Sequence, residues 1–179
     1  MHYQIKKPEE LTETEIQYIL KLWDISAWNT MTSTDFRAFF IQSEFHFLLD
    51  SMEGIQAIIR LNFDFTLEIS GNKYHFAEAV GLVSAEKNKG YGKKLIQYFL
   101  ENCVQKNRDV IGFCASELRI FYEKCQVPIL YNKAKDIQEK NDSEWMSSED
   151  DDILIFNASE EKKTILNHLD STNKAYLIL

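Results

Sequence analysis

The sequence has few residues that break, bend or cross-link a chain. Its 179 residues include six glycines, two prolines and three cysteines. So little Gly and Pro leaves little room for a flexible linker, and we expect one domain over residues 1–179. The cysteines, Cys103, Cys114 and Cys125, form no CxxC motif and cannot all pair. This usage favours a reducing compartment, and we expect a cytoplasmic protein.

Metal-ligand motifs and membrane-spanning runs are also missing. The four histidines lack the spacing of metal ligands, so no metal site is predicted. No apolar run approaches the length that crosses a bilayer, and the first residues hold no apolar signal core. The net charge of −8 argues against nucleic-acid or anionic-membrane partners and mildly favours a cationic one.

What the sequence does contain is a large apolar fraction with clear periodicity. Hydrophobic residues make up 45% of the chain, enough for a substantial core. Apolar residues alternate from Ile55 to Ile69, which predicts a long antiparallel strand with one buried face. Ser70-Gly71-Asn72 supplies a hairpin turn, and residues 74–83 return as the next strand.

The second strand of this hairpin runs into a turn that is rich in glycine and lysine. The turn reads Lys87-Asn88-Lys89-Gly90-Tyr91-Gly92, and an amphipathic helix with its apolar residues from Leu95 to Val104 follows. A strand, a glycine turn and a helix start together direct several backbone N–H groups and the positive helix dipole to one spot. Four lysines, at 87, 89, 93 and 94, surround that spot. A ligand that carries a pyrophosphate is therefore predicted.

Further elements follow from caps and periodicity. Residues 11–23 predict a helix in which Thr12 and Glu15 have capping-box spacing. Other predicted helices are 32–41, 117–124 and 160–169, and other predicted strands are 44–50, 109–114, 127–131 and 153–156. This order predicts an α/β (α+β) protein with a mixed, mostly antiparallel central sheet flanked by helices.

The glycine turn and its setting resemble the coenzyme-A loop of the GCN5-related N-acetyltransferases, the GNAT superfamily. The family pattern is Arg or Gln, two residues, Gly, any residue, then Gly or Ala; here Lys87 replaces the first position. The turn is neither a Walker loop nor a Rossmann fingerprint. The resemblance covers residues 11–156, with 157–179 as a C-terminal extension, and it implies the GNAT fold. The layout is most similar to aminoglycoside 2'-N-acetyltransferases.

Coenzyme A or acetyl-CoA is the cosubstrate that this resemblance implies, held mainly by backbone. Val80 and Leu82 would pair with the pantetheine arm as one strand pairs with another. The pyrophosphate would meet the turn residues Lys87, Asn88, Lys89, Gly90, Tyr91, Gly92 and Lys93. A strand amide near Val80 or Gly81 would donate to the thioester oxygen as its negative charge develops.

Glu78 is the candidate catalytic base. It lies between Phe76 and Val80 on one face of its strand, where apolar neighbours should raise the carboxyl pKa toward neutrality. Such a group suits a general base for an incoming amine. The residues alone equally allow a structural glutamate paired with a cation such as Arg60. The resemblance favours the base, because many GNAT enzymes place a catalytic or acceptor-binding glutamate on this strand.

Tyr122 is the candidate catalytic acid, in the segment FYEK. A neutral phenol can give its proton to a departing thiolate. Taken alone, an amphipathic tyrosine on a short helix is the simpler interpretation. The resemblance supports the acid, since FYEK some thirty residues beyond the glycine loop is a frequent GNAT signature. Gln126-Val127 departs from the Gly-Phe that commonly follows it.

The acceptor is predicted from an acidic run between Asp142 and Asp152, which holds no Lys or Arg. One interpretation is a solvated loop. The other is an anionic wall in which Asp150, Asp151 and Asp152, with Glu78, bind a cationic small molecule. Aminoglycoside 2'-N-acetyltransferases carry a similar acidic triplet before a late strand.

The resulting hypothesis is direct acetyl transfer from acetyl-CoA to a primary amine, with an aminoglycoside- or polyamine-like acceptor. Alternatives are a protein or peptide lysine acetyltransferase and a non-catalytic acyl-CoA-binding module. A nucleotide-binding α/β domain outside the GNAT superfamily would need a mostly parallel sheet, which the hairpin from Ile55 to Val83 contradicts. A homodimer through the apolar residues 175–179 is a further expectation; the same residues suit an ordinary final strand.

Overall fold

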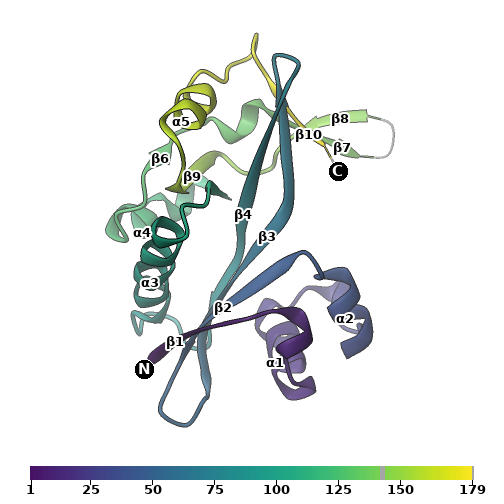
Figure 1. The fold of residues 1–179 in the computed structure, drawn as a ribbon, viewed down its shortest axis with the longest axis vertical. Coiled ribbons are helices and arrows are strands. Elements are labelled where there is room, and N and C mark those ends of the chain that lie inside the picture. The colour runs from purple at the N-terminus through teal and green to yellow at the C-terminus, as the bar shows by residue number, and fades with distance from the viewer. Residues whose placement is uncertain (142–143, 179) are drawn as a thin grey trace. The chain divides into compact units, whose positions relative to one another are not determined.

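The computed structural model describes residues 1–141 and 144–178 (Figure 1). The strands are β1 (His2–Lys6), β2 (Ser43–Leu49), β3 (Ile55–Ile69), β4 (Asn72–Ser84), β5 (Val110–Cys114), β6 (Ile129–Leu130), β7 (Ile137–Asn141), β8 (Glu144–Ser147), β9 (Asp152–Asn157) and β10 (Ala175–Ile178). The helices are α1 (Glu13–Trp23), α2 (Ser33–Phe39), α3 (Tyr91–Gln105), α4 (Arg119–Lys124) and α5 (Glu160–Asn167), and short 3-10 turns include η2 (Ser26–Trp28) and η3 (Ser116–Leu118).

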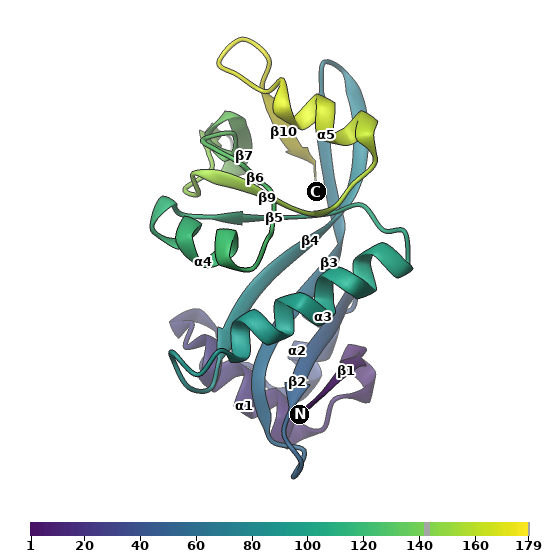
Figure 2. The same ribbon diagram turned by 90° about the vertical axis from the view of Figure 1, so that its left-hand side faces the viewer.

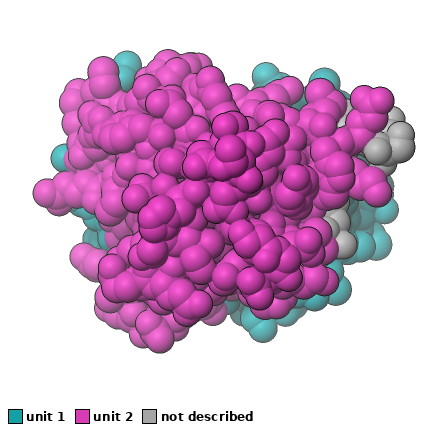
Figure 3. All heavy atoms as spheres, turned by 90° about the horizontal axis from the view of Figure 1, so that it is seen from above, with its two compact units in different colours: residues 1–62, 79–99 teal, residues 63–78, 100–179 magenta. Residues whose placement is uncertain are grey.

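The chain divides into two compact units, coloured in Figure 3. Unit 1 holds residues 1–62 and 79–99, and unit 2 holds residues 63–78 and 100–179. The strands β3 and β4 and the helix α3 each contribute residues to both units. Each unit is described by itself below.

Unit 1 is an antiparallel sheet with helices on its faces. β1 pairs with β2 and β2 pairs with β3, both antiparallel. The helices α1 and α2 cover one face, where Ile16, Phe36 and Phe45 lie in a core that is almost fully removed from water. On the other face the ring of Phe99 from α3 meets buried His46 edge-on, with 4.9 Å between centroids. This double cover explains why every residue of β2 is buried.

The start of α1 confirms the predicted capping box. The Thr12 hydroxyl accepts the Glu15 N–H at 3.2 Å, and the Glu15 carboxylate accepts the Thr12 N–H at 2.8 Å. These two bonds satisfy backbone donors that a helix start otherwise leaves open. Thr32 caps α2 in the same way, with Asp35 as its partner.

Unit 2 is a larger sheet in the order β6-β9-β5-β4-β3-β10-β7-β8. β5, β9 and β6 lie side by side and antiparallel (Figure 2). β10 pairs antiparallel with β3, where Ala175 faces Ile69, and parallel with β7, where Ala175 faces Ile137. The sheet is therefore mixed and mostly antiparallel, and with the flanking helices it confirms the predicted fold class. Its core includes Leu67, Ile111, Ile153 and Leu166.

Several local predictions are confirmed and a few are wrong. β3 has the predicted bounds, and Ser70 and Gly71 form the hairpin turn with positive φ. β1, β7 and β8 were not predicted, because their short sequences are mostly polar. The predicted buried row on α3 fails at Val104, which is 62% exposed. The apolar residues 175–178 form an inner strand of unit 2; Leu179 lies outside the described residues.

Candidate active site

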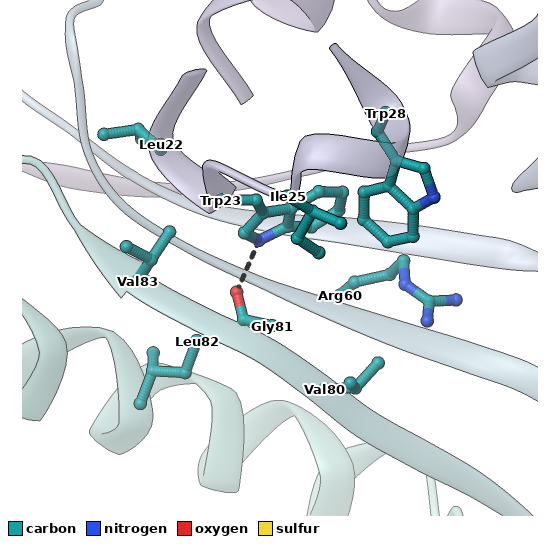
Figure 4. A pocket seen from close by; sticks show the side chains of 9 residues that line it. All are labelled: Leu22, Trp23, Ile25, Trp28, Arg60, Val80, Gly81, Leu82 and Val83. Carbon is teal, nitrogen blue, oxygen red and sulfur yellow. Dashed lines mark hydrogen bonds between the residues drawn. The ribbon is translucent and has the colours of Figure 1, made fainter. Parts of the chain in front are cut away.

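The strand β4 bends at Gly81, which adopts φ +70°. The indole Nε1–H of Trp23, on α1, donates a hydrogen bond to the Gly81 carbonyl at 2.8 Å (Figure 4). A Cβ at Gly81 would lie 2.9 Å from that Nε1, closer than carbon and nitrogen can approach. Both the backbone conformation and the packing therefore require glycine here. Val80 and Leu82, the predicted pantetheine contacts, flank the bend.

A pocket of about 300 Å³ opens beside this bend. Residues from α1, η2, β3 and β4 line it: Leu22, Trp23, Ile25, Trp28, Arg60, Val80, Gly81, Leu82 and Val83. Figure 4 shows the two tryptophans on the helical side and β4 opposite them. No carboxylate belongs to this lining. The helix that ends at Trp23 was predicted from the sequence, but the pocket was not.

The glycine turn after β4 has the geometry that the sequence predicted for an anion. Gly90 adopts φ +78° and its carbonyl accepts the Lys94 N–H at 3.0 Å, so α3 begins at Tyr91. The first-turn N–H groups of a helix have no partner within the helix and point out of its start. Lys87, Lys89 and Lys93 are exposed around that start, and Asn88 is held at φ +61°. Amides and cations of this kind suit a pyrophosphate.

Tyr122, the predicted acid, lies on α4 in unit 2 and is 7% exposed. Its hydroxyl makes no hydrogen bond within residues 1–141 and 144–178. Burial raises the pKa of its phenol, and the nearby Cys114, Cys125 and Asp150 raise the pKa further. The phenol is therefore neutral throughout the physiological range and holds a proton that it can donate.

Glu78, the predicted base, lies on the part of β4 that belongs to unit 2 and is half-buried. Phe76, which precedes Glu78 by two residues in the alternating row, is buried as expected. Its catalytic role and its raised pKa stay predictions.

The predicted acidic wall is divided between three different environments. Asp152 is fully buried and accepts two hydrogen bonds from Arg119, at 2.5 and 2.8 Å, which with the Asn132 N–H lower its pKa. Asp151 pairs with Lys135 at 2.6 Å and accepts the Ser116 N–H, and its pKa falls to about 2. Asp150 is half-buried, and burial followed by neighbouring carboxylates raises its pKa.

The rest of the acidic run is only partly a loop. Residues 144–147 form β8, which pairs with β7, and Trp145 meets the ring of Tyr176 edge-on at 5.0 Å. Asp142 lies outside the described residues. No partner for Asp151 or Asp152 could be predicted from the sequence, and in the structure Lys135 and Arg119 are those partners. Whether the triplet binds a substrate stays a prediction.

Neither a membrane-spanning helix nor a metal-binding cluster is found in the part of the chain that the structure describes. None of its helices is long and apolar enough to cross a bilayer. No group of three or more His, Cys, Asp or Glu side chains within 1–141 and 144–178 is arranged to hold a metal ion.

Solved structures with a similar fold decide the fold family. The GNAT family N-acetyltransferase YhbS from Escherichia coli, in complex with CoA, has a TM-score of 0.58 at 9% identity, with 98% of this chain and 87% of that chain covered. The chain has the GNAT fold. An acyl-CoA N-acyltransferase from Pseudomonas aeruginosa has a TM-score of 0.53 at 13% identity, with coverage of 86% and 97%. An N-acetyltransferase from Staphylococcus aureus also has 0.53, at 16% identity and coverage of 86% and 96%.

The likeness is one of fold, because all three identities are low. No protein-family model and no curated protein matches the sequence. The GNAT fold expected from the glycine turn and the order of elements is thus confirmed, while the likeness to aminoglycoside 2'-N-acetyltransferases stays a prediction.

Proposed function

We propose that this protein transfers an acetyl group from acetyl-CoA to a primary amine. The observation that carries the proposal is the turn at the end of β4. There Gly90 directs the start of α3, with Lys87, Lys89 and Lys93 around it, as a pyrophosphate site requires. The likeness in fold to the acyltransferases above, one of which is in complex with CoA, supports the same proposal.

The glycine turn and the end of β4 offer coenzyme A the groups that it needs, which are backbone hydrogen-bond donors and exposed lysines. Amides from Asn88 to Lys93 would bind the pyrophosphate, and Val80 and Leu82 would hold the pantetheine arm through backbone bonds. Acetyl-CoA, when bound, supplies a thioester whose carbonyl carbon is open to attack. In this proposal an amide at Val80 or Gly81, beside the positive φ of Gly81, would donate to the thioester oxygen.

In the proposed reaction Glu78 accepts a proton from the amine nitrogen, which forms a bond to the acetyl carbon. As the carbon–sulfur bond breaks, Tyr122 donates its phenolic proton to the sulfur, and the products are an amide and a free thiol. The state of the Tyr122 hydroxyl supports this role. Burial keeps the hydroxyl protonated, and it makes no hydrogen bond to a described residue.

A cationic acceptor, aminoglycoside- or polyamine-like, is the finer proposal from the sequence. Its support is the negative charge of Asp150, Asp151 and Asp152. The ion pairs of Asp151 with Lys135 and of Asp152 with Arg119 balance two of those charges. A lysine-bearing protein or peptide, and a non-catalytic acyl-CoA-binding module, are the alternatives. A single domain, a cytoplasmic location and a homodimer likewise stay proposals.

The test is thiol release from acetyl-CoA with a panel of amines, using the wild type and the variants Glu78→Gln and Tyr122→Phe. The panel holds aminoglycosides, polyamines, alkyl and aryl amines, amino acids and a lysine peptide. We expect each variant to lose roughly 10²–10⁴-fold in kcat. Tyr131→Phe is the matched control, because Tyr131 is exposed and its hydroxyl donates to Glu123 at 2.9 Å.

Coenzyme-A binding, measured by calorimetry, separates the alternatives. Binding without turnover on any amine would favour the non-catalytic module. Turnover that survives in both variants would contradict the assigned acid and base. An absence of binding would overturn the proposal as a whole.

A further inference from the structure

The pocket beside the bend in β4 has walls of rigid aromatic and branched aliphatic groups. The rings of Trp23 and Trp28 meet edge-on with 5.6 Å between centroids, and Trp28 meets Phe40 at 5.4 Å. The Trp23 indole cannot rotate freely, because it is bonded to the Gly81 carbonyl. The volume of the pocket, about 300 Å³, is at the lower end of the range for small-molecule sites. Such a pocket is shaped before a ligand arrives.

The single charge in this lining is positive. Arg60 lies with its guanidinium 4.9 Å over the Phe40 ring and donates to the Ser43 hydroxyl at 3.0 Å, so these contacts fix its position. A second ammonium group of a polycation would lie beside this guanidinium among apolar side chains, which cannot replace the water that it loses. An apolar group meets no such penalty.

The apolar surface continues outside the pocket. Ile25, in the lining, is 40% exposed, and the ring of Phe39, 65% exposed, lies 6.0 Å from that of Trp28. Exposed apolar side chains are common singly, but these adjoin a preformed apolar pocket. A ligand larger than the pocket would therefore find more apolar contact at its mouth.

We infer that this pocket binds the body of the acceptor, and that the acceptor is a monoamine with an aromatic or branched aliphatic group, in place of the aminoglycoside- or polyamine-like cation that the acidic triplet suggests. The inference rests on the proposed function, which places the thioester beside Val80 and Gly81, two residues of the same lining. The single methyl of an acetyl group fills little of the pocket, so the space remains for the amine. Flat rings pack well against the faces and edges of two indoles.

The first experiment compares matched amines of similar basicity. In the wild type, kcat/KM for 2-phenylethylamine should exceed that for propylamine and spermidine by at least about tenfold. Trp28→Ala should remove this preference, lowering the ratio of kcat/KM for 2-phenylethylamine to that for propylamine about tenfold. Ile25→Ala, at an exposed position, should give a smaller loss of the same selectivity without a risk to folding. Met52→Ala is the control, since Met52 is 85% exposed and lies outside the lining.

A binding experiment keeps the inference testable if no amine is turned over. The chain has three tryptophans, so a Trp145→Phe background leaves the fluorescence of Trp23 and Trp28. Saturable quenching by 2-phenylethylamine, weakened in Ile25→Ala, would support the pocket even where the proposed chemistry fails.

Two outcomes would overturn the inference while leaving acetyl transfer intact. One is turnover of spermidine or an aminoglycoside with an efficiency that matches or exceeds that of 2-phenylethylamine. The other is an effect of Trp28→Ala that depends on the acyl donor and not on the amine. Activity with octanoyl-CoA would then fall relative to activity with acetyl-CoA for every amine, and the pocket would hold an acyl chain.

Discussion

Aromatic rings surround the bend in β4 in unit 1, whereas ion pairs join the segments near the two ends of β5 in unit 2. In unit 1 the rings of Trp23, Trp28 and Phe40 contact one another. The indole of Trp23 also donates a hydrogen bond to the Gly81 carbonyl. In unit 2, Arg119 with Asp152, Lys135 with Asp151 and Lys162 with Asp109 join neighbouring segments. Ring packing depends on shape, while an ion pair depends on pH and salt.

The difference matters for what each region can do. A preformed aromatic pocket selects ligands by their shape. In unit 2, burial raises the pKa of Tyr122 and of Asp150, whereas the hydrogen bonds from Arg119 lower the pKa of Asp152. In the proposed reaction, the residues that would select the amine and those that would transfer its protons therefore lie in regions of different chemical character.

The largest loss of stability is expected for Gly81→Ala. The new methyl group would meet the Trp23 indole at 2.9 Å in a backbone with φ +70°. Strain and overpacking together should lower the free energy of unfolding by about 2–4 kcal/mol, measured by urea denaturation. In a Trp23→Phe background the cost should be smaller, because the indole nitrogen is gone. An equal cost in both backgrounds would show that ring packing does not fix the bend.

A smaller loss is expected for Asp152→Asn, which keeps the shape and removes the charge. Arg119 holds the pKa of Asp152 below its ordinary value, so the carboxylate stabilises the fold above about pH 4 and this contribution is lost as the pH falls. We expect a loss of about 1–3 kcal/mol at pH 7 that shrinks toward pH 3.

Asp150→Asn is the matched control, with the opposite sign. Burial raises the pKa of Asp150, so its ionised form opposes folding as the pH rises through that pKa. The amide should leave stability at pH 7 unchanged or raise it. A loss as large as that of Asp152→Asn would contradict this account of the charged region.

Gly90→Ala should cost less than Gly81→Ala, although both positions have a positive φ. Nothing lies within 4 Å of a Cβ at Gly90, so only the backbone penalty of about 1 kcal/mol remains. We expect the turn of the variant to relax from this φ in the free protein and to regain it when coenzyme A binds, so that calorimetry shows binding weakened about fivefold, the equivalent of that energy. Unchanged affinity would remove the turn from the proposed cosubstrate site.

The smallest effect is expected for Lys135→Ala. Lys135 is exposed, and its pair with Asp151 is screened by solvent and salt. The change in melting temperature should be the least of the set and should vanish at about 0.5 M NaCl, where the Debye length is only a few ångströms. A large effect that persists in salt would mean that exposed pairs hold this region together.

Local features of the fold could be predicted because their causes lie within a few residues. The capping box of Thr12 and Glu15, the alternation along β3 and the glycine turn before α3 are of this kind. The bend at Gly81 had a usable signal, since a glycine inside a strand often marks a bulge. Its partner had none: Trp23 reaches Gly81 from a helix 58 residues earlier.

The candidate site was harder, because its residues act through partners far along the chain. Asp151 and Asp152 read as free charge in the sequence, yet Arg119 is 33 residues from Asp152. Tyr122 was found through its resemblance to a family motif, and its burial follows from packing that no local pattern indicates. The aromatic pocket arises in the same way, from α1, η2, β3 and β4 together.

The position of β10 has a consequence for biosynthesis. β10 pairs with β3, about a hundred residues earlier in the chain, and closes one edge of that strand. While the intervening residues emerge from the ribosome, the unit 2 end of β3 keeps an open row of N–H and C=O groups and an apolar face. An open strand edge is a site of mispairing between nascent chains. We therefore expect truncation before Ala175 to yield aggregated protein, and slower translation of this stretch to raise the demand for chaperones.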